Sequence, residues 1–429
     1  MSTGRERRRL GLVSASALVV ASMIGAGVFT TSGFALADLG SPARVLFAWA
    51  VGGVTATCGA LCYGALARAL PESGGEYTYL ARTIHPLAGF LAGWVSLLAG
   101  FSAPIAAAAL GLQAYLDSSF ALGGDPRWIG TGAIALAGGL HGLRLTLGVV
   151  TQNAVVALKL ALILAFVLLG AWKLQLAERV SAAPAGEFDL GAFALSLVWI
   201  SFAYSGWNAA GYVAGEVRDP ERNLPRALIL GTAIVTLAYL ALNAVFVYAA
   251  PLAELAGKSE VGAIAAEALG GPGLRRFLTL IVALALFTSV SSMVMSGPRV
   301  VARMAADGLF PRAFAFTGDA PARAVALQVA LSIAVVWFAD LRQLIGYVGF
   351  TLGLCAAAAV VGLLRLRARA GAERVPVPGY PFVPALYLAM TLFASGYMVV
   401  REPVNAAYGV ATVAVGLVPY ALWRRRPSR

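Results

Sequence analysis

The sequence predicts an all-α integral membrane protein with twelve transmembrane helices. Of its 429 residues, 60% are hydrophobic and 12% are charged, and the mean hydropathy is +0.81. A soluble domain is roughly half apolar and a quarter charged, so most of this chain faces lipid or other buried helices. One span needs roughly 20 apolar residues. Windows of that length predict spans at residues 11–38, 43–67, 86–116, 127–143, 147–172, 189–214, 226–250, 275–300, 323–339, 342–364, 381–400 and 405–423.

Basic residues are distributed unequally between the two sides of these spans. With the N-terminus inside, the cytoplasmic segments hold 22 Lys and Arg residues and the outer segments nine, and Lys159 lies within a span. This asymmetry follows the positive-inside rule and predicts that both termini are cytoplasmic. The net charge of +12 therefore reflects topology rather than a nucleic-acid partner. The first span lacks a small-residue cleavage site before a polar start, so we expect it to be retained.

Several kinds of site are not expected in this chain. Cys58, Cys62 and Cys355 fall within predicted spans, where they are expected to be packing residues, and no loop carries a cysteine for an external disulfide framework. Two histidines without a Cys/His cluster argue against a metal site, and we expect no cofactor. A membrane enzyme would need paired carboxylates, a histidine cluster or a nucleophile–base pair at membrane depth, and the spans offer none. We therefore expect one polytopic, non-enzymatic domain over residues 1–429.

The first span is interrupted by the stretch "SMIGAGVFTTSG", Ser22–Gly33. Ala21 and Gly25 have the small-xxx-small spacing of close helix packing, but residues two apart do not share a helix face, so packing does not explain Gly27. Unwound backbone is tolerated in a membrane only where it lines a polar cavity. Unwinding here would present the N–H groups of Gly25, Ala26 and Gly27 at a half-helix N-terminus, which suits a carboxylate.

The sixth span is interrupted in the same way by "SFAYSGWNAAGYVAGEV", Ser201–Val217. A break near Ala203–Gly206 would free carbonyls at the negative end of the preceding half-helix, where an ammonium group is stabilised. A carboxylate at one break and an ammonium group at the other are what an α-amino acid requires. Phe202 either closes over such a ligand or packs in the core, while Ser205 and Asn208 are candidates to meet its side chain or amine.

The two interruptions fall in spans one and six, five spans apart, and two spans remain at the end. Interrupted helices at matching positions of two halves are the best sequence pointer to an inverted-repeat transporter. Five spans per half require the second half to run in the opposite direction. The predicted halves are residues 11–172 and 189–364, followed by two additional helices over 381–423.

Lys159, in "QNAVVALKLALIL", is predicted deep in the fifth span. A charge at that depth costs at least ~2.5 kcal/mol by insertion scales, which makes it a candidate functional residue. Snorkelling is the alternative, but Lys159 lies about twelve residues past the start of the span near Leu147. Such a lysine can exchange a proton or act as a fixed cation. The candidate neighbours are the hydroxyls of the eighth span, Thr288, Ser289, Ser291 and Ser292.

Two connections are candidates for extra structure. Residues 71–86 on the cytoplasmic side form either an interfacial helix or a plain loop, and the outer segment 251–271 contains a short helical pattern at Ala263–Leu269. Charged residues end spans six and eight at the predicted cytoplasmic face: Glu216 and Arg218 in the first, Arg299 and Arg303 in the second. Ordinary anchoring at the interface is favoured over gating pairs.

Four stretches in chain order resemble the amino acid–polyamine–organocation (APC) transporter superfamily. They are "MIGAGVFTTSG", "PESGGEYTYL" followed by "HPLAGFLAGW", "FAYSGWNAAGYVAGEVRDPERNLPRA" and "SGPRVVARMAADGLFP". Within it, the chain looks most like bacterial relatives of the L-type amino acid transporters. The resemblance implies a 5+5 inverted repeat of the LeuT type and alternating access. It also implies that Lys159 occupies the place where sodium-coupled relatives hold a sodium ion, that Phe202 is the inner gate, and that substrate is bound by the Gly25–Gly27 backbone and by Ile24, Phe202, Ala203 and Ser205.

The expected substrate is a neutral amino acid. Relatives often carry Asp or Gly where this chain has Ser205, and the absence of an acidic residue near the second break favours uncharged side chains. We expect sodium-independent transport in the plasma membrane, by exchange or proton-coupled uptake. The alternatives are a cationic amino acid or polyamine transporter of the same fold, and an amino acid sensor without transport. Eukaryotic members that join a heavy subunit use a cysteine between spans three and four, which "DSSFALGGDP" lacks, so no disulfide-linked partner is expected.

Overall fold

The computed structural model describes residues 10–142, 149–176, 187–316 and 321–424, and their regular structure is helical apart from one bridge between Leu10 and Val217. The elements are α1 (Leu12–Met23), α2 (Ala26–Leu39), α3 (Pro42–Ala69), α4 (Glu76–Thr83), α5 (Pro86–Val95), η1 (Ser96–Ser102), α6 (Ala103–Phe120), α7 (Arg127–Gly142), α8 (Val149–Leu176), α9 (Leu190–Tyr204), α10 (Ala209–Tyr212), η2 (Ala214–Glu216), α11 (Pro220–Tyr248), α12 (Leu252–Leu255), α13 (Val261–Ala306), η3 (Arg312–Phe314), α14 (Ala322–Phe338), α15 (Leu341–Ala370), α16 (Phe382–Arg401) and α17 (Pro403–Arg424).

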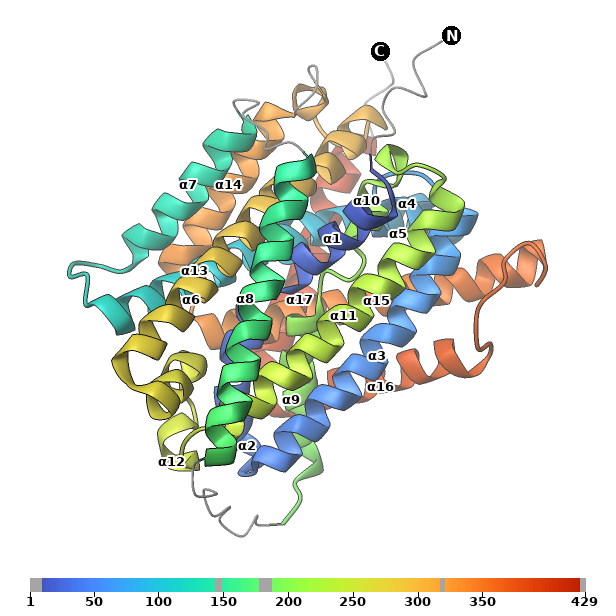
Figure 1. Ribbon diagram of the computed structural model, residues 1–429. Helices are drawn as coiled ribbons and strands as arrows, with labels where there is room; N and C mark the ends of the chain where they lie inside the picture. The colour runs from blue at the N-terminus through green and yellow to red at the C-terminus, as the bar shows by residue number, and fades with distance from the viewer. Residues whose placement is uncertain (1–9, 143–148, 177–186, 317–320, 425–429) are drawn as a thin grey trace.

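The chain is an all-helical membrane protein. Within the described ranges, nine helical segments are long and apolar enough to cross a bilayer, and α9 and α14 are shorter apolar helices. Helical residues also occupy the fourth predicted window, as α7. The long helices α3 and α11 lie side by side and run antiparallel through the molecule (Figure 1). Whether all twelve windows span the membrane as an inverted repeat stays a prediction.

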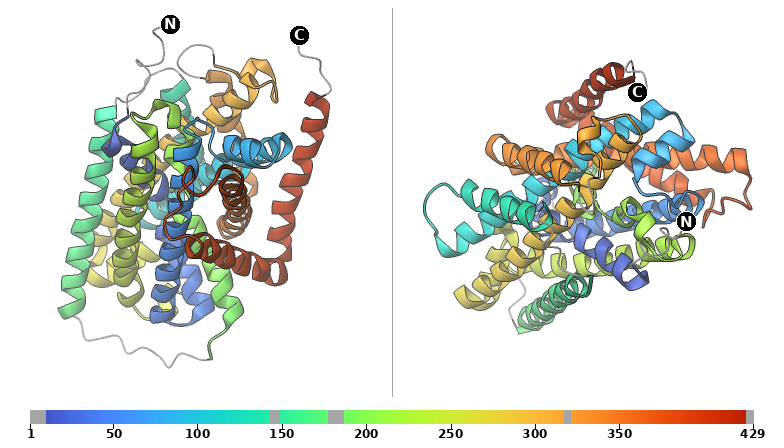
Figure 2. Two further views of the ribbon diagram at one scale, coloured as in Figure 1. Left: turned by 90° about the vertical axis from the view of Figure 1, so that its right-hand side faces the viewer. Right: turned by 90° about the horizontal axis from the view of Figure 1, so that it is seen from above.

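The third long segment lies at the centre of the molecule and the last lies at its rim. Helices α5, η1 and α6 form one span, Pro86–Phe120, of which 89% of the most apolar window is buried inside the protein, against 17% for Pro403–Trp423 of α17. Figure 2 shows α17 at the edge of the bundle in both views. The bare apolar surface of α17 therefore suits lipid contact.

Helix starts follow from local sequence. Pro42, Pro86 and Pro220 occupy first turns, where a missing N–H removes no hydrogen bond. The carboxylates of Asp189 and Asp340 accept hydrogen bonds from the first free N–H groups of α9 and α15.

Both connections that were candidates for extra structure contain a helix. Helix α4 occupies the connection 71–86. The backbone of α13 leaves helical geometry at Gly270 and Gly271, before Pro272, so the short outer helix around 263–269 is separate from the span that follows.

Candidate functional site

The helical backbone stops near the middle of the first apolar window. Helix α1 ends at Met23 and α2 begins at Ala26, while Ile24 (φ −74°, ψ 86°) and Gly25 (φ −129°, ψ −156°) are non-helical. The carbonyls at the end of α1 are then not taken up by the next turn. Met23 O accepts a hydrogen bond from the Tyr239 hydroxyl at 2.5 Å instead. N–H groups of Ala26 and its successors lie at the start of α2, which is the positive end of a helix.

A second break interrupts the sixth window. Helix α9 ends at Tyr204, Ser205 is extended (φ −59°, ψ 152°), and α10 begins at Ala209. Gly206 between them has φ +97°, a conformation that favours glycine. A Cβ on Gly206 would also lie 2.8 Å from Ser22 O, so the second break is in contact with the end of α1.

The two breaks pack directly against each other. A Cβ on Gly27 would lie 2.4 Å from Ala203 Cα and 2.5 Å from Ala203 Cβ, so Gly27 is required by the approach of two backbones. The Tyr239 hydroxyl lies within hydrogen-bonding distance of Met23 O and, at 3.0 Å, of Ala203 O, sharing its one proton between the negative ends of α1 and α9. Sequence reasoning missed Tyr239. The available signal was Tyr239 with Asn243, two polar residues four apart on one face of an apolar helix.

Lys159 is fully buried beside the first break. Its Nζ lies 3.5 Å from Ile24 O and 3.4 Å from Thr288 Oγ1. Ile24 closes the negative end of α1, a favourable place for a cation. Two other predicted neighbours contact the break instead: Ser289 Oγ lies 3.1 Å from where a Gly25 Cβ would be, and Ser292 Oγ lies 3.3 Å from Ser22 Oγ.

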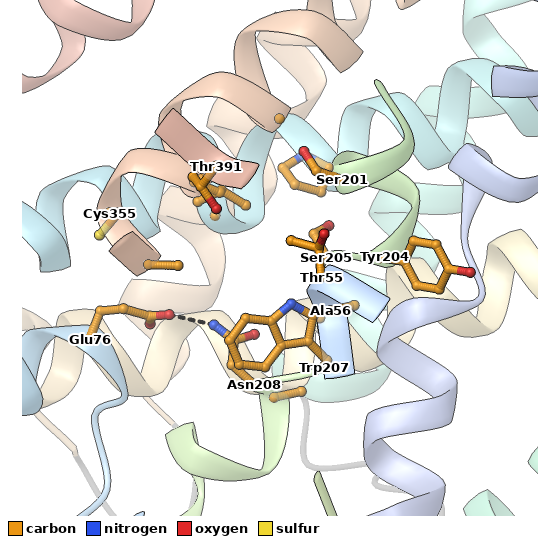
Figure 3. Close-up of a pocket in the computed structure, with 18 of the residues that line it drawn as sticks. Thr55, Ala56, Glu76, Ser201, Tyr204, Ser205, Trp207, Asn208, Cys355 and Thr391 are labelled. Atoms are coloured by element: carbon orange, nitrogen blue, oxygen red, sulfur yellow. Dashed lines mark hydrogen bonds between the residues drawn. The ribbon is translucent and has the colours of Figure 1, made fainter. Parts of the chain in front are cut away.

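A cavity of about 130 Å³ lies beside the second break (Figure 3). Its wall includes Ser22 from the end of α1, Gly206 from the second break, and the predicted binding residues Ser205 and Asn208. Thr55 of α3 and residues of α4, η1, α6, α9, α10, α13, α15 and α16 also line it. The other predicted binding residues do not line this cavity: Ile24 and Gly25 form the first break, Ala26 and Gly27 begin α2, and Phe202 and Ala203 lie in the last turn of α9.

Glu76 is a buried carboxylate at one side of this cavity, 4% exposed. It accepts hydrogen bonds from Tyr63 Oη at 2.9 Å, from Asn208 Nδ2 and from Tyr212 Oη. Figure 3 shows Glu76 and Asn208 facing each other across the lower edge of the cavity. The premise that no acidic residue lies near the second break is therefore wrong. Glu76 was missed because it precedes Asn208 by 132 residues, in a connection whose sequence does not indicate its partner.

Polar contacts join α4, and the residues just before it, to the C-terminal end of α13. The Tyr77 hydroxyl donates to Asp307 Oδ2 at 2.6 Å, and burial, followed by this hydrogen bond, raises the pKa of Tyr77, so the hydroxyl keeps its proton. Arg303 lies 3.1 Å from Asp307 and 3.6 Å from Glu72. These ion pairs are partly exposed, so each contributes little stability by itself.

Two of the charged residues at the ends of the sixth and eighth windows, Glu216 and Arg299, form an ion pair. Arg299 Nε lies 2.9 Å from Glu216 Oε1 and ties α13 to the short helix η2 that follows the second break. This geometry is compatible with a gating pair.

Comparison with known proteins agrees with this architecture. The family described as "Amino acid permease" matches residues 10–418. The chain belongs to the amino acid permease family. It is 28% identical to the large neutral amino acids transporter small subunit 2 of Homo sapiens, over 98% of this chain and 82% of that protein. It is 28% identical to the Asc-type amino acid transporter 1 of Mus musculus (98% and 83%) and 26% identical to the b(0,+)-type amino acid transporter 1 of Mus musculus (100% and 92%).

This permease is thus an amino acid transporter of the APC superfamily, a multi-pass membrane protein and not an enzyme. In the part of the chain that the structure describes, no group of three or more His, Cys, Asp or Glu side chains is arranged to hold a metal ion.

A second group of side chains joins α2, α9 and α15, away from the contacts of α4 and η2 with α13. Arg342, at the start of α15, lies 3.4 Å from Asp38 of α2, and its guanidinium carbon lies 4.7 Å from the ring centre of Trp199 in α9. The ring of Phe34 packs edge-on against Trp199 at 6.2 Å. A cation over an aromatic face is stabilised by the ring quadrupole. One arginine therefore links α2, α9 and α15.

Proposed function

We propose that this permease carries neutral L-amino acids across the plasma membrane by alternating access, without sodium. The observation that carries the proposal is the contact between the two broken helices, Gly27 against Ala203 and Gly206 against Ser22. It brings the positive end of α2 close to the negative ends of α1 and α9, as an amino acid backbone requires.

In the proposed complex, the substrate carboxylate binds the N–H groups of Gly25, Ala26 and Gly27. Its ammonium group binds carbonyls at the ends of α1 and α9, near Ile24, Phe202 and Ala203. The substrate side chain extends past Ser205 and Asn208 into the adjoining cavity. Phe202 acts as the inner gate. Because Tyr239 and Lys159 already contact Met23 O and Ile24 O, ligand binding and helix position are coupled at these carbonyls.

A neutral side chain is favoured by the cavity wall. Its apolar members include Phe101, Val198, Leu352 and Met390, and its hydroxyls are uncharged. The acidic residue of the wall, Glu76, already has three hydrogen-bond donors on its two oxygens, so it has little capacity left for a substrate cation.

A cationic side chain is the second candidate. The position of Glu76 beside Asn208 is the observation in its favour.

For coupling, we propose that Lys159 takes the place of a sodium ion. It contacts the end of α1 through Ile24 O and α13 through Thr288. Exchange and proton symport both suit this arrangement, because a buried lysine can hold its charge or release a proton. Ser289 and Ser292 lie at the same junction, against Gly25 and Ser22.

The proposed topology has cytoplasmic termini and twelve spans. Residues 11–172 and 189–364 would form the inverted repeat, with 381–423 added to it. The loop between α6 and α7 has no cysteine, so we propose that no heavy subunit is attached by a disulfide.

The test is uptake of radiolabelled leucine into proteoliposomes of the purified permease. Saturable uptake in choline buffer supports a sodium-independent transporter, and a requirement for sodium would overturn that part. Acceleration by internal leucine identifies exchange, and acceleration by an inward proton gradient identifies symport. Labelled arginine and putrescine, added in parallel, test the cationic alternative. Binding without uptake would identify a sensor.

A further inference from the structure

A second groove lies between α3 and α11, away from the broken helices. The two helices approach closely where a Cβ on Gly64 would lie 3.2 Å from Pro225 Cα. Beside this point is a groove of about 400 Å³. Figure 1 shows α3 and α11 side by side, with the connection between α15 and α16 passing at the same end of α3. The groove is lined by Leu61, Gly64, Ala65, Arg68, Glu221, Arg222, Pro225, Arg226, Ile229, Pro376 and Pro378.

The wall of this groove has one apolar end and one cationic end. On α3 the lining residues follow the helix period, so Leu61 and Arg68, seven residues apart, share one face. At 1.5 Å per residue, they are about 10 Å apart along the axis. Arg222 and Ile229 of α11 have the same separation in the opposite chain direction. Because α3 ends and α11 begins at this side, the arginines of both helices lie at one level and the aliphatic side chains about 10 Å deeper.

The cationic end carries unbalanced charge. Arg68, Arg222 and Arg226 are exposed, and none of them forms an ion pair within the ranges that the structure describes. Glu221 supplies one negative charge in the same groove, which leaves an excess of positive charge. Arginine binds phosphate with paired N–H donors, so this end suits a phosphodiester better than it suits chloride or water alone.

We propose that this groove binds one anionic phospholipid of the cytoplasmic leaflet. Its phosphate lies among Arg68, Arg222 and Arg226, and one acyl chain lies against Leu61 and Ile229. Basic pockets between membrane helices on the cytoplasmic side are suited to such headgroups. The proposal rests on the proposed cytoplasmic position of these helix ends, but not on transport.

Lipid bound in the groove would hold α3 against α11. Helix α11 also carries Tyr239, which contacts both broken helices. The lipid would therefore stabilise the helix that supports the substrate site.

The experiment measures lipid binding by native mass spectrometry of the detergent-purified, full-length permease. Dioleoylphosphatidylglycerol is titrated against dioleoylphosphatidylcholine. The test variant is Arg68→Gln, Arg222→Gln and Arg226→Gln combined. The matched control removes three exposed cytoplasmic charges outside the groove, Arg312→Gln, Arg365→Gln and Arg369→Gln.

We expect the wild type to prefer the anionic lipid, the groove variant to bind it about 100-fold more weakly, and the control to change by less than about threefold. Equal losses in the two variants would mean general attraction to basic loops and would overturn the proposal. The melting temperature of the wild type is also measured with inorganic phosphate and with the anionic lipid. An equal rise with both would identify a plain anion site and would also overturn the proposal.

A second variant tests the acyl end without changing charge. Leu61→Trp fills the apolar part of the groove, so it should weaken binding of the anionic lipid at least about fivefold while all three arginines remain. Unchanged binding in this variant would contradict an acyl chain at Leu61. Because no substrate is present in these measurements, they are independent of the outcome of the leucine uptake experiment.

Discussion

Replacing Gly27 by alanine tests the contact between the two broken helices. The new Cβ would lie 2.4 Å from Ala203 Cα, 2.5 Å from its Cβ and 3.0 Å from its N. Carbon atoms in ordinary contact are about 3.5–4.0 Å apart, so the backbones must separate by about 1 Å or more. The obstacle includes backbone atoms, which no side-chain rotation removes. Overpacking of this kind costs about 1–3 kcal/mol, and 2 kcal/mol is a factor of about 30 in an equilibrium.

The assay is leucine uptake into proteoliposomes together with thermal stability in detergent. Gly27→Ala should lower uptake at least about tenfold, since both the N–H groups at the start of α2 and the position of α9 are displaced. Two alanine variants serve as controls. In Gly25→Ala the new Cβ meets the Ser289 hydroxyl at 3.1 Å, a side-chain end that can rotate, so a smaller loss is expected. In Gly132→Ala no atom lies within 4 Å, so no change is expected.

The expected order of damage to uptake and thermal stability is Gly27→Ala, then Gly25→Ala, then Gly132→Ala. If Gly27→Ala transports and melts like Gly132→Ala, the close approach of α2 to α9 does not exist in the working protein. If Gly25→Ala is the more damaging of the two, the first break matters for its conformation and not for its contact with Ala203.

Three further predictions concern single side chains. Lys159→Ala should abolish the proton dependence of uptake or slow transport while the protein still folds; unchanged rate and pH dependence in proteoliposomes would refute a coupling role. Glu76→Gln replaces one accepting oxygen by an amide that opposes buried donors, so it should destabilise the folded state by about 1.5–3 kcal/mol in denaturant unfolding, whereas Glu72→Gln, in a partly exposed ion pair, should cost less than about 1 kcal/mol. Equal effects would contradict the assigned role of Glu76. Arg342→Ala should loosen the contact of α2, α9 and α15 and increase labelling of a Ser201→Cys variant by an impermeant thiol reagent from outside; unchanged labelling would show that Arg342 does not restrict that side.

The sequence was sufficient where the signal is local. The prediction that helical backbone stops in this stretch is right, with Ile24 and Gly25 non-helical. The reason given for Gly27 is wrong: Ala26 and Gly27 are helical, and close packing against Ala203 explains the glycine at 27. Apolar windows likewise located the helices, and the pattern at Ala263–Leu269 indicated the outer helix, which ends at Gly270 and Gly271. Each of these inferences depends on residues within one or two helical turns.

The remaining contacts depend on which helices meet, and periodicity does not contain that information. Lys159 contacts Ile24 across 135 residues, and its hydroxyl neighbour is Thr288 rather than Ser289 or Ser292, because the rotation of α13 about its axis selects the facing residue. Glu76 follows a turn-rich connection typical of an exposed segment, yet it is buried by α3 and α10.

If substrate binds at the two breaks as proposed, the carbonyls there would link the position of the substrate to that of the helices. Met23 O and Ala203 O share the single proton of Tyr239, and Ile24 O is 3.5 Å from the Lys159 amine. A substrate ammonium group at these helix ends would compete with both side chains for the same lone pairs. Because Tyr239 belongs to α11 and Lys159 to α8, any change in their hydrogen bonds changes how α1 and α9 are held by these neighbouring helices. Binding at the breaks can therefore shift the packing of whole helices without any contact to the distant ends where Arg342 and Arg303 lie.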